Sequence, residues 1–441
     1  MESLILYMRK ISMSKIYFIV LDGAADYKIQ ALNNRTPLEM AYTPAMDRLA
    51  EHGIMSMIEI LPKEYVPETD SGLMALLGYD PIKYYCGRGT LEAMGRGLYK
   101  EYRHFVGFRV NFASYNDKKA VLERRTARGL SFEELRILTD EILKNVKLNK
   151  YPKVNYDLVS FGIHRGILSF YSNEVELSGN VSNTDPGFVK NGYFSIPVDK
   201  YENKVLSCIP LDDKKSSNIT ATIVNDFIKQ SHEVLEGSDI NRIRKERSLL
   251  PCNWLILRDG GSLAIQMDSF FRKYRRKLAI YGELPCEKAL AELIGADFCY
   301  SQEFSLQLNN EYLFHLADKL VNEDSDIVFC HLKGPDEPGH DHDPVGKVQV
   351  IEKIDKYFMS RIVKAKSEDD IVVVTCDHAT PCALGIHSND KVPLLISSNN
   401  IVADGMLHFC EENAAIGSCP VLKAVDIMEY LVERGISCGE S

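Results

Sequence analysis

Histidine and aspartate side chains gather near the C-terminal end of the chain. Five of the 11 histidines fall between residues 331 and 387, and the aspartates that accompany them include Asp336, Asp341, Asp343 and Asp377. Packing does not explain this density, because buried charges are costly unless they are paired or bind an ion. Carboxylates and imidazoles without thiolates suit Mn²⁺, Zn²⁺ or Mg²⁺. Two such ions about 4 Å apart stabilise both the attacking and the leaving oxygen of a phosphoryl group.

Three short segments supply these side chains. The glycines and prolines of Lys333-Gly-Pro-Asp336-Glu-Pro-Gly-His340 predict an irregular loop that turns Asp336 and His340 toward one point. Asp377 and His378 are adjacent, and His387 follows them closely. A lone Asp–His pair is more often a hydrogen-bonded structural pair than a metal site. Several such pairs together favour a metal site.

Thr69 offers a nucleophile for such a metal site. It lies in Val66-Pro-Glu-Thr69-Asp-Ser71-Gly, ahead of an apolar helical run. A hydroxyl at a helix N-terminus lies where backbone N–H groups attract a phosphate, and a cation lowers its pKa. The alternative is that Thr69 or Asp70 only caps the helix. Ser71 is a second hydroxyl near the same helix start.

Buried strands must position these residues. Strands are predicted over 15–21, 54–61, 326–331 and 370–376, with a helix over 43–51. This alternation is typical of a doubly wound, mostly parallel α/β sheet. The first strand runs directly into Asp22, and the last two also end at polar residues. Open α/β sheets bind ligands at the carboxyl ends of their strands, so we expect these ends to converge on one site.

The middle of the chain has a different character. Turn-rich and polar stretches occur at 178–187 and 212–218. We predict a smaller α+β domain over 101–273, inserted between two parts of a metal-binding core at 14–100 and 274–436.

Composition excludes several classes of protein. The 441 residues are 45% hydrophobic and 26% charged, as in a globular enzyme. The 52 Lys+Arg against 62 Asp+Glu give a net charge of −10, so nucleic acid is not an expected partner. The 11 cysteines form no C-x-x-C motif, which favours reduced thiols and a cytoplasmic location. No apolar run is long enough to predict a membrane span, and the N-terminus does not read as a signal peptide.

Characteristic motifs extend over nearly the whole chain. They are Asp22-Gly23, the hydroxyl–Asp pair ahead of Leu-Gly78-Tyr-Asp-Pro81, Gly87-Arg88-Gly, Phe161-Gly-Ile-His164-Arg165-Gly, Thr184-Asp185-Pro186, the Lys288 segment, the GPDEPGH string at 334–340, and Asp377-His378 followed by His387. Together they closely resemble the archaeal-type cofactor-independent phosphoglycerate mutases of the alkaline phosphatase superfamily. The resemblance implies an alkaline-phosphatase-like core and an isomerase of glycolysis and gluconeogenesis.

The resemblance also implies two metal sites and a substrate site. One metal site consists of Asp22, Thr69, Asp377 and His378, and the other of Asp336, His340 and His387. The residues facing the phosphoglycerate are Arg88, Arg109, His164, Arg165, Asp185 and Lys288. Thr69 stands where the family has its nucleophilic serine.

We therefore expect two divalent ions, with Mn²⁺ favoured, and a small phosphorylated substrate. The expected reaction interconverts 3-phosphoglycerate and 2-phosphoglycerate through a phospho-threonine. A metal-dependent phosphatase or phosphonate hydrolase of the same superfamily is the first alternative. A non-catalytic metal- or ligand-binding relative is the second.

Overall fold

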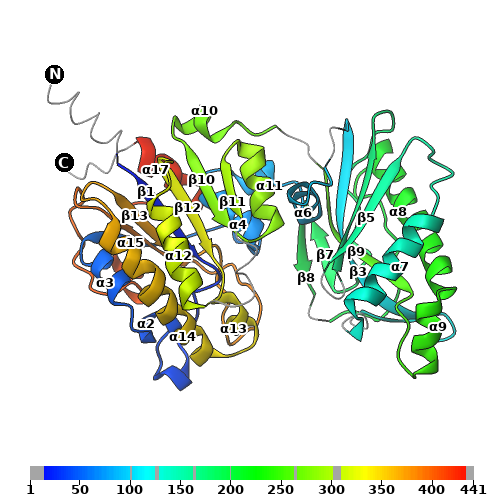
Figure 1. Cartoon of the computed structure of the whole chain (residues 1–441), viewed down its shortest axis with the longest axis horizontal. Helices are drawn as coiled ribbons and strands as arrows, with labels where there is room; N and C mark the ends of the chain where they lie inside the picture. The colour runs from blue at the N-terminus through cyan, green and yellow to red at the C-terminus, as the bar shows by residue number, and fades with distance from the viewer. Residues whose placement is uncertain are drawn as a thin grey trace. The chain divides into compact units, whose positions relative to one another are not determined.

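The computed structural model describes residues 14–99, 102–124, 129–161, 165–198, 200–262, 266–300 and 309–433. The chain divides into two compact units (Figure 1). The first takes the chain up to Tyr84 and again from Met267, and the second takes Tyr85–Gln266.

A seven-stranded sheet forms the centre of the first unit, in the order β11-β10-β12-β1-β13-β14-β2. Its strands are β1 (Ile16–Leu21), β2 (Gly53–Ile58), β10 (Leu278–Gly282), β11 (Asp297–Tyr300), β12 (Ile327–Leu332), β13 (Ile371–Thr375) and β14 (Val392–Ser397). β14 runs antiparallel to both β13 and β2, and the other neighbouring strands pair in parallel. Every residue of β1, β12 and β13 is buried, which is typical of strands covered on both faces. The predicted mostly parallel α/β sheet is confirmed.

Two groups of helices cover the sheet (Figure 1). One group contains α2 (Pro37–Met40), α3 (Pro44–Ala50), α12 (Asn310–Val321), α14 (Pro344–Ile354) and α15 (Ser360–Ala365). The other contains α4 (Thr69–Leu76), α11 (Pro285–Ile294) and α17 (Ile427–Glu433). The short helix α13 (Asp336–His340) follows β12 directly, where the sequence predicted an irregular loop.

The second unit is built on an antiparallel sheet. Its strands are β3 (His104–Asn116), β4 (Val121–Glu123), β5 (Asn155–Phe161), β6 (Arg165–Ser172) and β9 (Trp254–Gly261), beside a hairpin of β7 (Phe188–Asn191) and β8 (Phe194–Pro197). The helices α7 (Phe132–Asn145), α8 (Lys215–Glu236) and α9 (Asp239–Glu246) also belong to this unit. Its core includes Phe108, Phe112, Phe170 and Phe227.

The second unit begins and ends earlier than the predicted insert of 101–273. Helix α6 (Arg88–Gly95) belongs to it because α6 packs on β3 and β9. Helix α6 and strand β3 approach each other closely, because a Cβ atom on Gly89 would lie 2.6 Å from the carbonyl oxygen of Gly107. Glycine at 89 therefore permits this contact between helix and strand.

Within the described ranges, no helix combines the length and the apolar character that a bilayer crossing requires. No disulfide joins any of the ten cysteines in those ranges.

Candidate active site

The register of the central strands brings the first polar residues together. Val20 on β1 pairs with His331 on β12 and with Thr375 on β13. Asp22, Lys333 and Asp377 each lie two residues after these paired positions, just past the ends of the three strands. The backbone N–H of Gly23 donates to Asp377 Oδ1 at 3.1 Å, which fixes this alignment. The carboxyl ends of three neighbouring strands therefore meet at one point.

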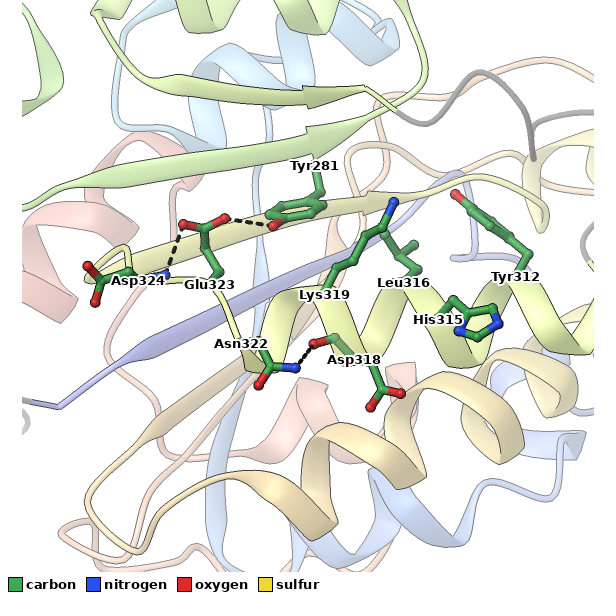
Figure 2. A pocket seen from close by; sticks show the side chains of 9 residues that line it. All are labelled: Tyr281, Tyr312, His315, Leu316, Asp318, Lys319, Asn322, Glu323 and Asp324. Atoms are coloured by element: carbon green, nitrogen blue, oxygen red, sulfur yellow. Dashed lines mark hydrogen bonds between the residues drawn. The ribbon is translucent and has the colours of Figure 1, made fainter.

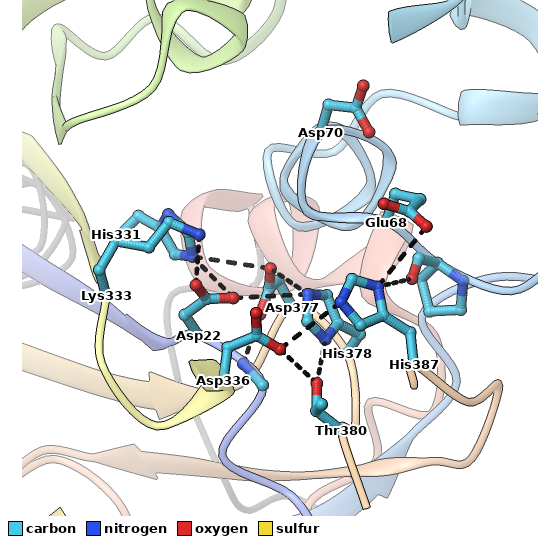
Figure 3. Close-up of polar contacts among 12 residues, drawn as sticks. Asp22, Glu68, Asp70, His331, Lys333, Asp336, Asp377, His378, Thr380 and His387 are labelled. Atoms are coloured by element: carbon cyan, nitrogen blue, oxygen red, sulfur yellow. Dashed lines mark hydrogen bonds and ion pairs between the residues drawn. The ribbon is translucent and has the colours of Figure 1, made fainter. Parts of the chain in front are cut away.

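Asp22, His331, Asp377 and His378 form a buried group, here called the deep cluster (Figure 3). His378 Nε2 lies 3.1 Å from Asp377 Oδ2 and 3.4 Å from Asp22 Oδ1. His331 Nε2 lies 3.6 Å and 3.7 Å from the same two oxygens. Burial alone would raise the pKa of Asp377, but His378 and His331 outweigh it and hold that pKa well below its usual range.

One polar atom of each residue in the deep cluster has no hydrogen-bond partner. These atoms are Asp22 Oδ1, His331 Nε2, Asp377 Oδ2 and His378 Nε2. An unsatisfied buried polar group costs about 1–3 kcal/mol, and more when it is charged. A divalent cation would satisfy the carboxylate oxygens and the imidazole nitrogens at once. The donor set therefore fits a metal ion.

Asp336, His340 and His387 form a second group, here called the outer cluster. His340 Nε2 lies 3.3 Å from Asp336 Oδ2, and His387 Nε2 lies 3.5 Å from Asp336 Oδ1. The hydrogen bond to Asp336 raises the pKa of His340 to about 9. The side chain of His340 is 40% exposed, so solvent reaches this cluster. The rings of His387 and His378 stack with centroids 3.7 Å apart, which places the two clusters side by side.

Three imidazoles of these clusters are oriented through Nδ1. His340 Nδ1 lies 2.9 Å from the carbonyl oxygen of Gly385, and His378 Nδ1 lies 3.1 Å from Thr380 Oγ1. His387 Nδ1 lies 3.2 Å from the carbonyl oxygen of Pro67. In each case Nε2 is directed toward the carboxylates. Metal-binding histidines commonly use this arrangement, because the second nitrogen fixes the ring.

Thr69 is the first residue of α4, and it is buried. Glu68 caps the helix, so the alternative that Thr69 or Asp70 is the capping residue is wrong. The Ser71 hydroxyl donates to the Glu68 carbonyl and accepts from the Glu68 N–H, both at 3.0 Å. A Cβ atom on Gly72 would lie 2.4 Å from the Asp377 carbonyl oxygen, so the first turn of α4 packs directly against the deep cluster.

Glu287 and Lys333 also contact the deep cluster, although the sequence did not single them out. Glu287 Oε1 lies 2.5 Å from His331 Nδ1, and Lys333 Nζ forms an ion pair with Asp22 Oδ2. The predicted Lys288 lies instead on the exposed face of α11, with Nζ 3.5 Å from Glu292. Burial would lower the pKa of Lys333, but Asp22 outweighs it and raises that pKa.

Two of the predicted arginines come together in the second unit. Glu92 Oε1 lies 3.0 Å from Arg88 Nε and 3.4 Å from Arg109 Nε. Arg109 also pairs across the sheet with Arg258, and Asp259 Oδ2 lies 3.4 Å from both guanidinium groups. Burial alone would raise the pKa of Glu92, but Arg109 and Arg88 lower it. Arg258 was not anticipated, because its place depends on the β3–β9 register.

The other predicted substrate residues of this unit are placed differently. Asp185 is fully buried and forms an ion pair with Arg124 through both carboxylate oxygens, one of them at 2.8 Å. Arg165 is exposed at the start of β6, where it pairs with Asn111 on β3. His164 lies outside the described residues.

A surface hollow of about 670 Å³ lies elsewhere in the first unit (Figure 2). It is lined by Tyr281, Tyr312, His315, Leu316, Asp318, Lys319, Asn322, Glu323 and Asp324. None of the predicted site residues lines it, so this hollow is separate from the two clusters.

Comparison with known proteins identifies the family. The sequence profile described as 2,3-bisphosphoglycerate-independent phosphoglycerate mutase matches residues 50–241. A protein of that name from Aeropyrum pernix is 34% identical over 394 residues, which are 88% of this chain and 91% of the relative. The chain belongs to this family. A phosphoglycerate mutase of the same family from Archaeoglobus fulgidus is 33% identical over 95% of this chain and 97% of its own.

Solved structures agree with this assignment. A protein from Pyrococcus horikoshii superposes with a TM-score of 0.74 at 27% identity, covering 97% of this chain and 98% of that one. The cofactor-independent phosphoglycerate mutase of Thermoplasma acidophilum gives a TM-score of 0.65 at 27% identity, covering 96% and 100%. The resemblance noted from the motifs is therefore confirmed, as is the expectation of a cofactor-independent phosphoglycerate mutase, an isomerase.

Proposed function

We propose that this phosphoglycerate mutase interconverts 3-phosphoglycerate and 2-phosphoglycerate, and that Thr69 carries the phosphoryl group between the two half-reactions. One observation carries the proposal: the first turn of α4 packs against Asp377 of the deep cluster. The outer cluster adjoins the same helix start, because His387 Nδ1 lies 3.8 Å from Glu68 Oε1.

Two divalent ions belong to this proposal. Asp22, Thr69, Asp377 and His378 would hold one, and Asp336, His340 and His387 would hold the other. The unpartnered buried atoms of the deep cluster support this assignment. Carboxylates and imidazoles without thiolates suit Mn²⁺, Zn²⁺ or Mg²⁺, and Mn²⁺ is the ion we favour. When bound, such ions neutralise charge on the phosphoryl oxygens and lower the pKa of a nearby hydroxyl.

In the first half-reaction the Thr69 hydroxyl gives up its proton as its oxygen attacks the phosphorus atom, and the bond from phosphorus to the glycerate oxygen breaks. That oxygen takes up a proton, and the glycerate stays bound. In the second half-reaction the other hydroxyl of the reoriented glycerate gives up its proton and attacks the phosphorus atom of the phospho-threonine. The bond from phosphorus to the Thr69 oxygen breaks, and that oxygen takes up a proton. Thr69 suits this role better than Ser71, whose hydroxyl is engaged with Glu68.

The remaining predicted residues would recognise the substrate. Arg88, Arg109 and Arg165 would bind phosphate and carboxylate, because guanidinium groups match both in a bidentate geometry. The arrangement of Arg88 and Arg109 around Glu92 supports this role, because it holds two guanidinium groups side by side. His164, Asp185 and Lys288 would contact the glycerate part.

The proposal places the protein in glycolysis and gluconeogenesis, acting on a small phosphorylated substrate in the cytoplasm. Neither nucleic acid nor a membrane is needed for the reaction.

An enolase-coupled assay tests the proposal. Purified protein is given 3-phosphoglycerate with Mn²⁺ and without added bisphosphoglycerate. We expect turnover that is lost after chelation and restored by Mn²⁺. Release of inorganic phosphate faster than formation of 2-phosphoglycerate would favour the hydrolase alternative. A protein that binds ions but converts no substrate would favour the non-catalytic one.

A further inference from the structure

Glu287 forms a buried pair with His331 of the deep cluster. His331 Nδ1 lies 2.5 Å from Glu287 Oε1, and the other oxygen of Glu287 accepts from the Leu284 N–H at 2.7 Å. Both side chains are buried. The pair therefore fixes the plane of the His331 ring and directs Nε2 toward Asp22 and Asp377 (Figure 3).

Each residue of the deep cluster has one polar atom engaged and one left over. Asp22 Oδ2 pairs with Lys333, and Asp377 Oδ1 accepts from the Gly23 N–H. His331 Nδ1 is engaged by Glu287, and His378 Nδ1 by Thr380. The four remaining atoms are those that have no hydrogen-bond partner. Each of the four side chains is thus oriented so that one potential metal-ligand atom faces those of the other three.

The separations of these four atoms suit a single ion. Each imidazole Nε2 lies between 3.1 and 3.7 Å from each of the two carboxylate oxygens. Nitrogen and oxygen ligands about 2.1 Å from one ion lie about 3–3.5 Å from their neighbours. In Figure 3, Asp22 and Asp377 lie between the two imidazoles. A cation between the carboxylates would therefore have one imidazole on either side.

We propose that His331 Nε2 is a ligand of the deep cation, together with Asp22, Asp377 and His378. This inference rests on the metal dependence proposed above and adds a residue to the ligand set that the family resemblance implied. Glu287 is then a positioning residue, because a carboxylate on the second nitrogen commonly orients a metal-binding histidine. With Thr69, five buried side chains then hold the deep ion, so it binds more tightly and exchanges more slowly than the ion of the outer cluster.

The test uses full-length protein loaded with Co²⁺, and separately with Mn²⁺. Bound metal is counted by elemental analysis after dialysis, and the affinity of the tight ion is measured by chelator competition. We expect Glu287→Gln, which removes only the orienting partner, to weaken binding of the tight ion by about 10–100-fold. His331→Gln, which removes the ligand itself, should weaken it further and change the visible absorption of bound Co²⁺. His315→Gln, an exposed histidine of α12, is the matched control and should change neither.

The outcomes separate this inference from the function on which it rests. If wild-type protein binds no divalent ion, the proposed metal dependence fails, and this inference fails with it. If wild-type protein binds a tight ion and His331→Gln keeps the same affinity and spectrum, His331 only donates a hydrogen bond to the carboxylates, and this inference alone is wrong. If His331→Gln does not fold, as judged by circular dichroism, Glu287→Gln decides, because it leaves the imidazole in place.

Discussion

Lys347 Nζ lies 2.8 Å from Asp26 Oδ2, and neither side chain is exposed to solvent. The same ammonium group donates to the carbonyl oxygens of Ala25 at 3.3 Å and Thr380 at 2.9 Å. Lys347 on α14 therefore connects two segments. One follows β1 and carries Asp22, and the other follows β13 and carries Asp377 and His378 of the deep cluster.

Lys347→Met should destabilise the protein and disturb the deep cluster. Removing one partner of a buried ion pair leaves the other charge uncompensated, which costs about 3–5 kcal/mol. Chemical denaturation measures the loss, and elemental analysis measures bound metal in the variant. Lys364→Met on α15 removes an exposed lysine and should stay within about 0.5 kcal/mol of wild type. Equal stability of the two variants would contradict the structural role of Lys347.

The two hydroxyls at the start of α4 should behave differently. Thr69→Ala should abolish turnover, whereas Thr69→Ser should keep much of it because the attacking oxygen remains. Ser71→Ala should mainly remove the capping hydrogen bonds to Glu68, worth about 1 kcal/mol of stability. Rapid acid quench followed by peptide mass spectrometry locates the phosphoryl group. Phosphate on Ser71, or normal turnover by Thr69→Ala, would overturn the assignment.

The sequence predicted the centre of the fold well, because buried parallel strands have a local signature. The apolar runs of β1, β12 and β13 each end at polar residues, and the rule that strand ends form ligand sites predicted their convergence. The strand predicted over 54–61 is β2, which spans Gly53–Ile58. Its place at the edge of the sheet could not be inferred from the alternation of strand and helix.

Other features depend on contacts that no local pattern encodes. His331 joins the deep cluster because β12 is in register with β1, a pairing of distant segments. Adjacent residues on a helix point about 100° apart, so packing decided that Glu287 and not Lys288 faces the cluster. The ion pair between Asp185 and Arg124 could not be predicted either, because Arg124 follows a strand that is distant from Asp185 in the sequence.

The two metal sites should lose their ions at different rates. The His340 side chain of the outer cluster is 40% exposed, whereas the deep cluster is buried. Dialysis of loaded protein against a chelator should therefore remove about one ion per chain quickly and the second slowly. Elemental analysis of samples taken over time measures the two phases. His340→Ala should abolish the fast phase and keep the slow one, and loss of both ions at one rate would contradict two distinct sites.

Asp355 should give the protein a specific pH dependence. Burial raises the pKa of Asp355 to about 6, although the N–H groups of Met46 and Ala45, at 2.8 and 3.1 Å, lower it. An unfolded aspartate has a pKa of about 3.9, so the folded protein holds this proton to a higher pH. The contribution of Asp355 to the free energy of unfolding should therefore fall as pH rises from about 4 to about 6, and remain lower above that range.

The Asp355→Asn variant has an amide that cannot ionise at this position. Comparing it with wild type therefore isolates the contribution of Asp355 to the free energy of unfolding. The stability of wild type relative to the variant should decrease by an amount on the order of 1–3 kcal/mol between pH 4 and pH 7. Denaturation curves for both proteins across this range measure the difference. Parallel stability curves would show that Asp355 does not titrate in this way.

Arg109 tests the substrate role of the second unit. Its guanidinium group lies beside Arg88 and Arg258, with Glu92 and Asp259 offsetting only part of the positive charge. If Arg109 binds the phosphate or carboxylate of the substrate, Arg109→Ala should remove a charge-assisted hydrogen bond worth about 1.5–3 kcal/mol. That loss corresponds to about 10–150-fold in kcat/KM. Arg109→Lys should recover little of it, because an ammonium group lacks the planar fork of a guanidinium.

Two controls distinguish a loss of substrate binding from a loss of bound metal and from the general effect of removing a positive charge. Arg109 lies in a different unit from both clusters, so Arg109→Ala should bind as much metal as wild type. Arg136→Ala removes an exposed arginine of α7 and should leave kcat/KM unchanged. Steady-state kinetics with 3-phosphoglycerate and elemental analysis on the same preparations provide both readouts. An Arg109→Ala variant with wild-type kcat/KM would show that this arginine group does not bind substrate, and lost metal would show that its effect is structural.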